Sequence, residues 1–326
     1  MRKNLIFFGA AALVMALASC SKVENVEKGG SSEIAIKALN NLQTKAVIEG
    51  TTFPAANEMQ IAAQYDNGGV YSTYFGDNSG VTFAKKEAVW AGKANPYFWP
   101  LEGSMNFLAL SSSTAIPAAT FTFDDAAVSG LVIASVETYK GSDAADNQDD
   151  LLFSDSATQA CAGKNTAAVP MTFNHATAWL FFNVKCSLAS TADMPIVINS
   201  ITVNGVKTAG SLEVTAGTPS TAEWTLSGTA AGKLVPQDDV LEFAAADTQY
   251  AIGNGILLPE QAQSSFTIDY TIGDNENMKY TYDFDSSETW EMGKKYTYNI
   301  SLTLNEITVS PSVNDWGTVA DTDVEI

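Results

Sequence analysis

The sequence has almost no arginine: Arg2 is the only one among its 326 residues. Acidic side chains outnumber basic ones by 37 to 17, and the formal net charge at pH 7 is −20. Proteins that bind nucleic acid use lysine and arginine to neutralise the phosphate backbone, so we expect no nucleic-acid partner. The same charge disfavours electrostatic binding to an anionic lipid surface.

Cysteine is also scarce, with Cys20, Cys161 and Cys186 as its three members. In an oxidising compartment Cys161 and Cys186 could form a disulfide, although nothing in their positions requires it. A chain of this length can bury a sufficient core without a covalent link. We therefore expect both cysteines to be dispensable for folding.

The single histidine, His175, is a candidate general base. Catalysis would require a nucleophile beside it, such as a serine, whereas a structural histidine needs only a packed strand. Cys161, His175 and Cys186 lack the closely spaced ligand pairs of zinc sites. We favour the structural role and expect no enzymatic activity, no metal and no cofactor.

Two other clusters allow a functional and a structural interpretation. Asp143, Asp146, Asp149 and Asp150 are oxygen ligands suited to calcium, but no glycine stands at the sharp turn of an EF-hand loop. A solvated acidic loop is therefore favoured. Aromatic residues near position 95 could stack on sugars, but large aromatics are usually buried, so core packing is favoured. These aromatic residues are Trp90, Tyr97, Phe98 and Trp99.

Long apolar runs are absent except at the N-terminus. Residues 5–17 are mostly apolar and follow Arg2 and Lys3, which is the pattern of a signal peptide and is too short to span a membrane. The segment Leu17-Ala18-Ser19-Cys20 resembles the lipobox of bacterial lipoproteins. It predicts a signal peptide over residues 1–19, cleavage between Ser19 and Cys20, and a lipid on the Cys20 sulfur. A plain secretory signal is the alternative.

Beyond a polar tether over residues 20–32, the sequence shows strand patterns and almost no helical period. Apolar residues alternate with polar ones in residues 266–272, 280–284 and 296–304, as in half-buried antiparallel strands. Residues 179–182 are apolar on both faces, which predicts a central covered strand. A stretch poor in apolar residues, 154–168, divides two groups of strands. The sequence thus predicts an all-β protein with two β-sandwiches, over residues 33–167 and 168–326.

Several segments resemble the fimbrillin family of Bacteroidota, which comprises type V pilins and fimbrillin-like lipoproteins. No segment is specific alone, but they follow one another with plausible spacing over most of the mature chain. They are Tyr97-Phe98-Trp99-Pro100, Asn106-Phe107-Leu108-Ala109, Asp150-Leu151-Leu152-Phe153, Val169-Pro170-Met171-Thr172-Phe173-Asn174-His175-Ala176, Ile201-Thr202-Val203-Asn204-Gly205 with Gly210, Leu257-Leu258-Pro259, Trp290-Glu291-Met292-Gly293-Lys294-Lys295-Tyr296-Thr297-Tyr298 and Val313-Asn314-Asp315-Trp316.

The resemblance implies two tandem transthyretin-like antiparallel β-sandwich domains and export as a lipoprotein to the outer membrane. It also implies assembly with other subunits into surface fimbriae that support adhesion. In that scheme a maturation protease removes the first strand, and a strand of the neighbouring subunit fills the groove that remains. Alternatives are a surface glycan-binding lipoprotein and an anchor or accessory subunit that does not polymerise.

Candidate parts for such assembly are present at both ends of the chain. Ile34 and Ile36 alternate with other residues in a short strand, and Lys45-Ala46 follows in a polar loop. Cleavage in many relatives follows arginine, so Lys45 is the local candidate here and an uncut first strand is the alternative. The candidate donor strand, marked by Ile307, Val309 and Val313, could instead be the last strand of its own domain.

Overall fold

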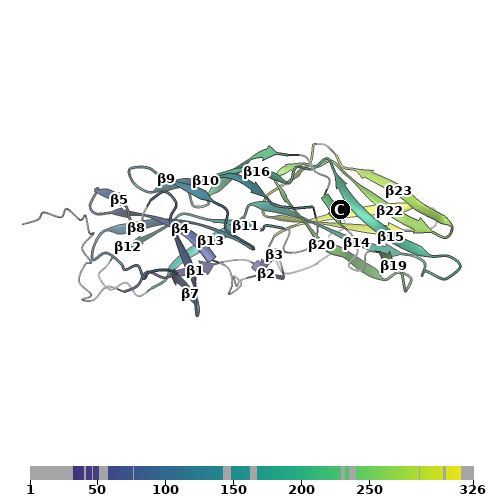
Figure 1. Cartoon of the computed structure of the whole chain (residues 1–326), viewed down its shortest axis with the longest axis horizontal. Coiled ribbons are helices and arrows are strands. Elements are labelled where there is room, and N and C mark those ends of the chain that lie inside the picture. Colours follow the sequence, from purple (N-terminus) through teal and green to yellow (C-terminus); the bar gives the residue numbers. More distant parts are fainter. Residues whose placement is uncertain are drawn as a thin grey trace, which may run out of the picture. The chain divides into compact units, whose positions relative to one another are not determined.

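The alternating patterns form β-strands in the computed structural model (Figure 1). The structure describes residues 32–316 except 40–41, 46, 51–57, 76, 142–147, 162–166, 229–231, 235–239, 286 and 304–305. These described residues form strands, turns and bends with no helix, which confirms the all-β class. Accordingly, no helix within the described part of the chain could cross a membrane.

The largest sheet, which we call the N-terminal sheet, has nine strands. Strand β8 also pairs with β4, so the sheet folds back on itself. In order across the sheet the strands are β12 (Ala157–Ala160), β8 (Ser104–Ser112), β11 (Leu151–Ser154), β13 (Val169–His175), β1 (Ile36–Leu39), β7 (Val89–Gly92), β6 (Val81–Lys86), β4 (Glu58–Asp66) and β5 (Tyr71–Thr73).

The side chains enclosed by this sheet form the N-terminal core. Aromatic rings fill much of it, and Phe75 contacts Phe83 and Tyr97 at centroid distances of 5.6 and 4.7 Å. The buried members of the core are Ile34, Ile36, Met59, Ile61, Ala63, Phe75, Phe83, Trp90, Trp99, Met105, Phe107, Ala109, Leu152, Cys161, Val169, Met171 and Phe173.

A second, four-stranded sheet covers the opposite face of β4, β8 and β11. Apolar residues from both layers pack between the sheets, including Leu108 and Leu110 of β8. Burial of this face explains why β8 is apolar on both sides, as expected of a covered strand. In order the strands of this sheet are β17 (Thr221–Ser227), β16 (Ala209–Thr215), β10 (Val128–Glu137) and β9 (Ala119–Phe123).

Two further sheets enclose the C-terminal core, which includes Phe182, Phe266, Trp290 and Tyr298. Strand β14 lies between β20 and β25, so the predicted central strand over residues 179–182 is confirmed. One sheet has the order β20 (Gln249–Pro259), β14 (Thr177–Cys186), β25 (Lys294–Leu302) and β26 (Ile307–Asp315). The other has the order β18 (Gly232–Leu234), β15 (Ile196–Asn204), β22 (Ser265–Ile272) and β23 (Asn275–Asp283), with β19 (Leu241–Glu242) also paired to β15.

Strand pairings cross the expected division between residues 167 and 168. Strand β13 pairs with β1 and β11, and β16 pairs with β10, although β13 and β16 follow residue 168. The sheets are therefore not divided at that point, and the number of domains stays a prediction.

Two short pairs complete the fold: β2 (Leu42–Lys45) with β3 (Val47–Gly50), and β21 (Gln261–Ala262) with β24 (Thr289–Trp290).

Candidate functional site

The first strand, β1, lies inside the N-terminal sheet rather than at its edge. It runs parallel to β13 from Ile36 opposite Val169 to Leu39 opposite Thr172, and Ile36 also pairs with Trp90 of antiparallel β7. The sequence predicted a strand at this place, and the structure confirms it. Removing β1 would leave β13 paired with β11 alone among the described strands and would open the sheet between β13 and β7.

The residues just before β1 are held on both sides. The Ile34 amide donates to the carbonyl of Tyr97 at 2.7 Å, and the Val169 amide donates to the carbonyl of Ala35 at 2.8 Å. Ile34 and Ile36 are fully buried in the N-terminal core. Burial of each such side chain stabilises the fold by about 1.5–3 kcal/mol. Without these two side chains, the N-terminal core would contain two empty spaces.

The far end of β1 is less enclosed. Lys37 and Leu39 are exposed, and β2 follows after residues 40–41. Lys45 is the last residue of β2 and pairs with Val47 of β3. Ala46, the other half of the candidate cleavage site, lies outside the described residues.

A cavity of about 940 Å³ adjoins the exposed end of β1, within the size range of ligand and peptide sites. Lys37 and Glu260 bring formal charges to its wall, and the Glu260 carboxylate accepts a hydrogen bond from the Met292 amide at 3.1 Å. The cavity lies beside the C-terminal end of β1, at Lys37, Ala38 and Leu39. Its lining residues are Lys37, Ala38, Leu39, Phe153, Thr172, Phe173, Asn174, His175, Ser220, Thr221, Ala222, Glu260, Met292, Gly293 and Trp316.

His175 lies at the end of β13 and contacts two distant parts of the chain. Its Nδ1 lies 2.9 Å from Oδ1 of Asp150, and both side chains are buried. Its ring stacks on Trp316 with a centroid distance of 3.7 Å and an interplanar angle of 6°. Nε2 is buried and has no hydrogen-bond partner among the described residues, so no described serine is paired with it. These contacts support the structural role expected for His175.

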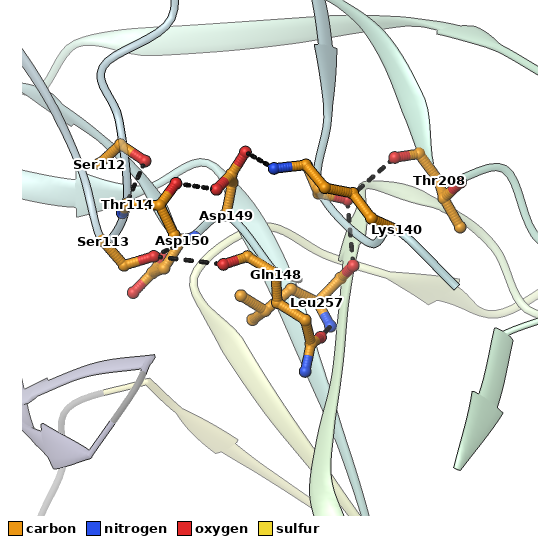
Figure 2. A network of polar contacts seen from close by, with 10 residues as sticks. Ser112, Ser113, Thr114, Lys140, Gln148, Asp149, Asp150, Thr208 and Leu257 are labelled. Atoms are coloured by element: carbon orange, nitrogen blue, oxygen red, sulfur yellow. Dashed lines mark hydrogen bonds and ion pairs between the residues drawn. The ribbon is translucent and has the colours of Figure 1, made fainter. Parts of the chain in front are cut away.

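Asp149 and Asp150 do not belong to a solvated loop, so that expectation is wrong for them. Both are buried, and Asp149 accepts hydrogen bonds from Thr114 and, at 3.0 Å, from Lys140 (Figure 2). The Asp150 amide donates to Ser113 Oγ at 2.9 Å. Protein groups thus contact both residues, and the described residues contain no group of acidic, histidine or cysteine side chains arranged to hold a metal. The other two acidic residues, 143 and 146, lie outside the described residues.

Gln148 extends the same network to the C-terminal sheets (Figure 2). Its Nε2 donates to the carbonyl of Gly255 at 2.9 Å, and its Oε1 accepts from the Leu257 amide at 2.8 Å. Thr138 Oγ1 donates to the carbonyls of Thr208 and Leu257 at 3.2 and 3.0 Å. No spacing in the sequence indicated this network, because its members come from segments that are far apart along the chain.

The aromatic cluster near residue 95 is mainly core. Trp90 and Trp99 are buried, and Tyr97 stacks on Phe83 at 5.9 Å. The prediction of core packing is therefore confirmed for both tryptophans. Phe98 is the exception, since its side chain is exposed.

Cys161 and Cys186 are free thiols, so the candidate disulfide is not formed in the structure. Cys161 belongs to the N-terminal core and Cys186 to the C-terminal core. Burial raises the pKa of the Cys161 thiol to about 11, which leaves little of the reactive thiolate at neutral pH.

We expect both thiols to stay unreactive in the folded protein at pH 8. A chromogenic disulfide reagent should report no rapid reaction in native buffer. In denaturant it should report two thiols per chain that carries a lipid on Cys20, and three in an unmodified precursor, because the sequence has three cysteines. Rapid reaction of the native protein at either buried cysteine would contradict this assignment.

The candidate donor segment forms β26, an edge strand that pairs with β25 and with no other described strand. Ile307 and Val309 pack partly against the C-terminal core, whereas Val313 is exposed. Pro311 lacks an N–H group, and an edge strand such as β26 tolerates it because one side of the strand forms no ladder. Beyond β26, Trp316 packs with Trp179 and Leu257, in addition to its stacking on His175.

The end of β26 is also held by an ion pair. Lys294 of β25 binds the carboxylate of Asp315, and this hydrogen bond raises the pKa of the lysine amine. Both side chains are substantially exposed, so the pair contributes little to stability. Packing of Trp316, rather than charge, therefore holds this end of the strand.

Comparison with known proteins gives one family and several similar folds. The profile of a family described as fimbrillin-like matches residues 35–316. No curated protein matches the chain significantly. A fimbrial protein from Bacteroides vulgatus has 14% sequence identity and a TM-score of 0.53, with 86% of this chain and 99% of that chain covered.

Two candidate cell adhesion proteins have the same degree of structural similarity. The one from Bacteroides uniformis has 17% identity and a TM-score of 0.53, with 87% of this chain and 98% of that chain covered. The one from Bacteroides ovatus has 16% identity and a TM-score of 0.53, with 89% and 99% covered. At these identities the likeness establishes the fold.

Proposed function

Because this chain belongs to the fimbrillin-like family, we propose that it is a fimbrial subunit, exported as a surface lipoprotein and assembled by protease-triggered strand exchange. One observation carries the proposal: β1 is a short strand inserted between β13 and β7, with Ile34 and Ile36 in the N-terminal core. A strand that can be cut away from such a position leaves a groove of matching shape.

Cleavage after Lys45 would separate β1 from the rest of the chain. Loss of β1 leaves the β13 backbone unpaired from Val169 to Thr172 and empties the spaces of Ile34 and Ile36. An incoming strand would satisfy the backbone by β-augmentation, and its alternate side chains would fill the two spaces and set the register. Until then β1 protects the sheet from uncontrolled pairing.

The donor in this proposal is β26. It pairs on one side only, so its release breaks one ladder, and Ile307 and Val309 alternate as the two spaces require. Trp316 would have to leave His175 during release. Packing of Trp316 therefore opposes premature donation.

Membrane attachment in this proposal comes from a lipid on Cys20, which places the precursor at the outer membrane. A role as an anchor or accessory subunit that does not polymerise is the second candidate. The scarcity of arginine favours it, since no arginine follows β1 and Lys45 alone offers a basic cleavage site between β1 and residue 50. The two roles differ in whether the bond after Lys45 is cut.

Treatment of the purified lipoprotein with a lysine-specific protease tests the proposal. We expect limited cleavage after Lys45, followed by ladders that resist sodium dodecyl sulfate and by filaments visible in the electron microscope. Untreated protein should remain monomeric. Resistance of the bond after Lys45 to the protease would favour the accessory role, and cleavage there without any polymer would contradict strand exchange.

A further inference from the structure

Four exposed apolar side chains gather on two loops at one end of β4. Their exposed fractions are 71% for Val70, 39% for Tyr71, 40% for Phe98 and 62% for Leu101. We call these four residues the apolar tip. Residue 71 pairs with Asp66 at the end of β4, and the Tyr65 hydroxyl donates to the carbonyl of Glu102 at 2.9 Å. Both loops are thus fastened to the same strand end.

The four side chains of the tip are uncharged, and the charged residues that adjoin its two loops include the acidic Asp66 and Glu102. Residues 67–75 and 94–101 contain no aspartate, glutamate, lysine or arginine, in a protein with 54 such residues. Elsewhere the acidic excess would repel an anionic surface and would keep a second acidic copy at a distance. A charge-free apolar surface suits an apolar environment, because transfer of a charge out of water is costly.

The described chain begins at this tip. The Trp99 amide donates to the carbonyl of Ser32 at 3.1 Å, and Glu33 forms a β-bridge with Phe98. Cys20 lies twelve residues before Ser32, a length of chain that spans at most ~40 Å. A lipid on Cys20 would therefore limit the distance between the bilayer and the tip, whereas it sets no such close limit for the more distant parts of the described chain.

We propose that the apolar tip contacts the bilayer surface in the lipid-anchored precursor, with Val70 and Leu101 entering the headgroup region. The proposal rests on lipidation of Cys20, which belongs to the proposed function. The partner is a zwitterionic lipid surface without net charge, since the tip offers apolar side chains and no cations. Such contact would orient the precursor with the entry point of the chain toward the membrane.

A fluorescent reporter at Leu101 tests the contact. The full lipidated chain carrying Leu101→Cys is labelled with an environment-sensitive dye, while Cys161 and Cys186 are protected by burial. It is then inserted into vesicles of phosphatidylcholine and phosphatidylethanolamine. We expect the dye emission to rise about twofold when the protein is inserted into vesicles, relative to the same protein before vesicles are added. Nitroxide-labelled lipids should then quench this emission. Val70→Cys provides a second reporter if Leu101→Cys folds poorly.

Met278→Cys is the matched control. Met278 is an exposed apolar residue on β23, outside the tip, and its dye should be insensitive to nitroxide lipids. Equal quenching at Met278 and Leu101, or none at either tip position, would overturn the proposal. If a second dye-labelled copy of the chain quenches the Leu101 dye without vesicles, the tip belongs to a contact between subunits. That result would also overturn the proposal.

Lipidation is measured separately, by labelled palmitate on the full chain and on Cys20→Ala. If Cys20 carries no lipid, the proposed anchoring fails, and the reporter variants are then prepared with Cys20→Ala, so that the dye labels the reporter cysteine alone, and are added to the same vesicles at high lipid concentration. Nitroxide quenching at Leu101 but not at Met278 would then sustain the tip contact, and its absence would overturn it.

Discussion

The Lys45→Gln variant is expected to fold normally, keep its lipid and lose the ability to polymerise. Without cleavage after residue 45, β1 stays between β13 and β7, and Ile36 of β1 and the preceding Ile34 continue to fill the N-terminal core. No groove opens, so no donated strand can pair. Unheated samples in sodium dodecyl sulfate should show the monomer alone where the unsubstituted chain shows a ladder.

Lys279→Gln is the control for this variant, because Lys279 is an exposed lysine on β23, remote in sequence from the candidate cleavage site. It should polymerise as the unsubstituted chain does. Filaments from Lys45→Gln would show that cleavage at this bond is not the trigger. Loss of filaments from both variants would point to a general effect of charge.

The Ile36→Asp variant is expected to lose roughly 4 kcal/mol of unfolding free energy or to fail to accumulate. Ile36 is fully buried beside Trp90 and Val169, and an aspartate there would place a carboxyl group among apolar side chains. Urea denaturation followed by tryptophan fluorescence measures the loss.

Lys37→Asp separates the effect of burial from the effect of charge. It adds an aspartate one residue further along β1, where the side chain is exposed, and should change the unfolding free energy by less than about 1 kcal/mol. Similar losses from the two variants, or a small loss from Ile36→Asp, would mean that β1 does not fill the core.

Strands with strict alternation were predictable because a period of two specifies both the strand and its buried face. Strands β22 and β25 follow the alternation at residues 266–272 and 296–302. The covered strand β14 was predictable for a related reason, since apolar residues on both faces require neighbours on both faces.

Pairing between distant strands was not predictable in the same way. Strand β13 inserts between β11 and β1, and β16 joins β10, although each is separated from its partner by many residues. Local pattern carries no information about such partners. The composition of residues 154–168 suggested a division of the chain there. It could not indicate that β13 and β16, which follow this stretch, pair with strands that precede it.

The candidate site was partly predictable. Alternation indicated the strand at Ile34 and Ile36, but not that it lies inside a sheet. Stacking of His175 on Trp316 was missed, although each residue stands in a segment typical of the family. This ring contact depends on the meeting of two segments that lie far apart along the chain, which no spacing in the sequence reports.

The most direct test of strand exchange is the N-terminal sequence of subunits taken from the ladders that resist sodium dodecyl sulfate. The account predicts that these subunits begin at Ala46 and lack both the lipid and β1, whereas monomeric precursor begins at lipid-modified Cys20. Ladders whose subunits begin at Cys20 and retain Ile34 and Ile36 would contradict it.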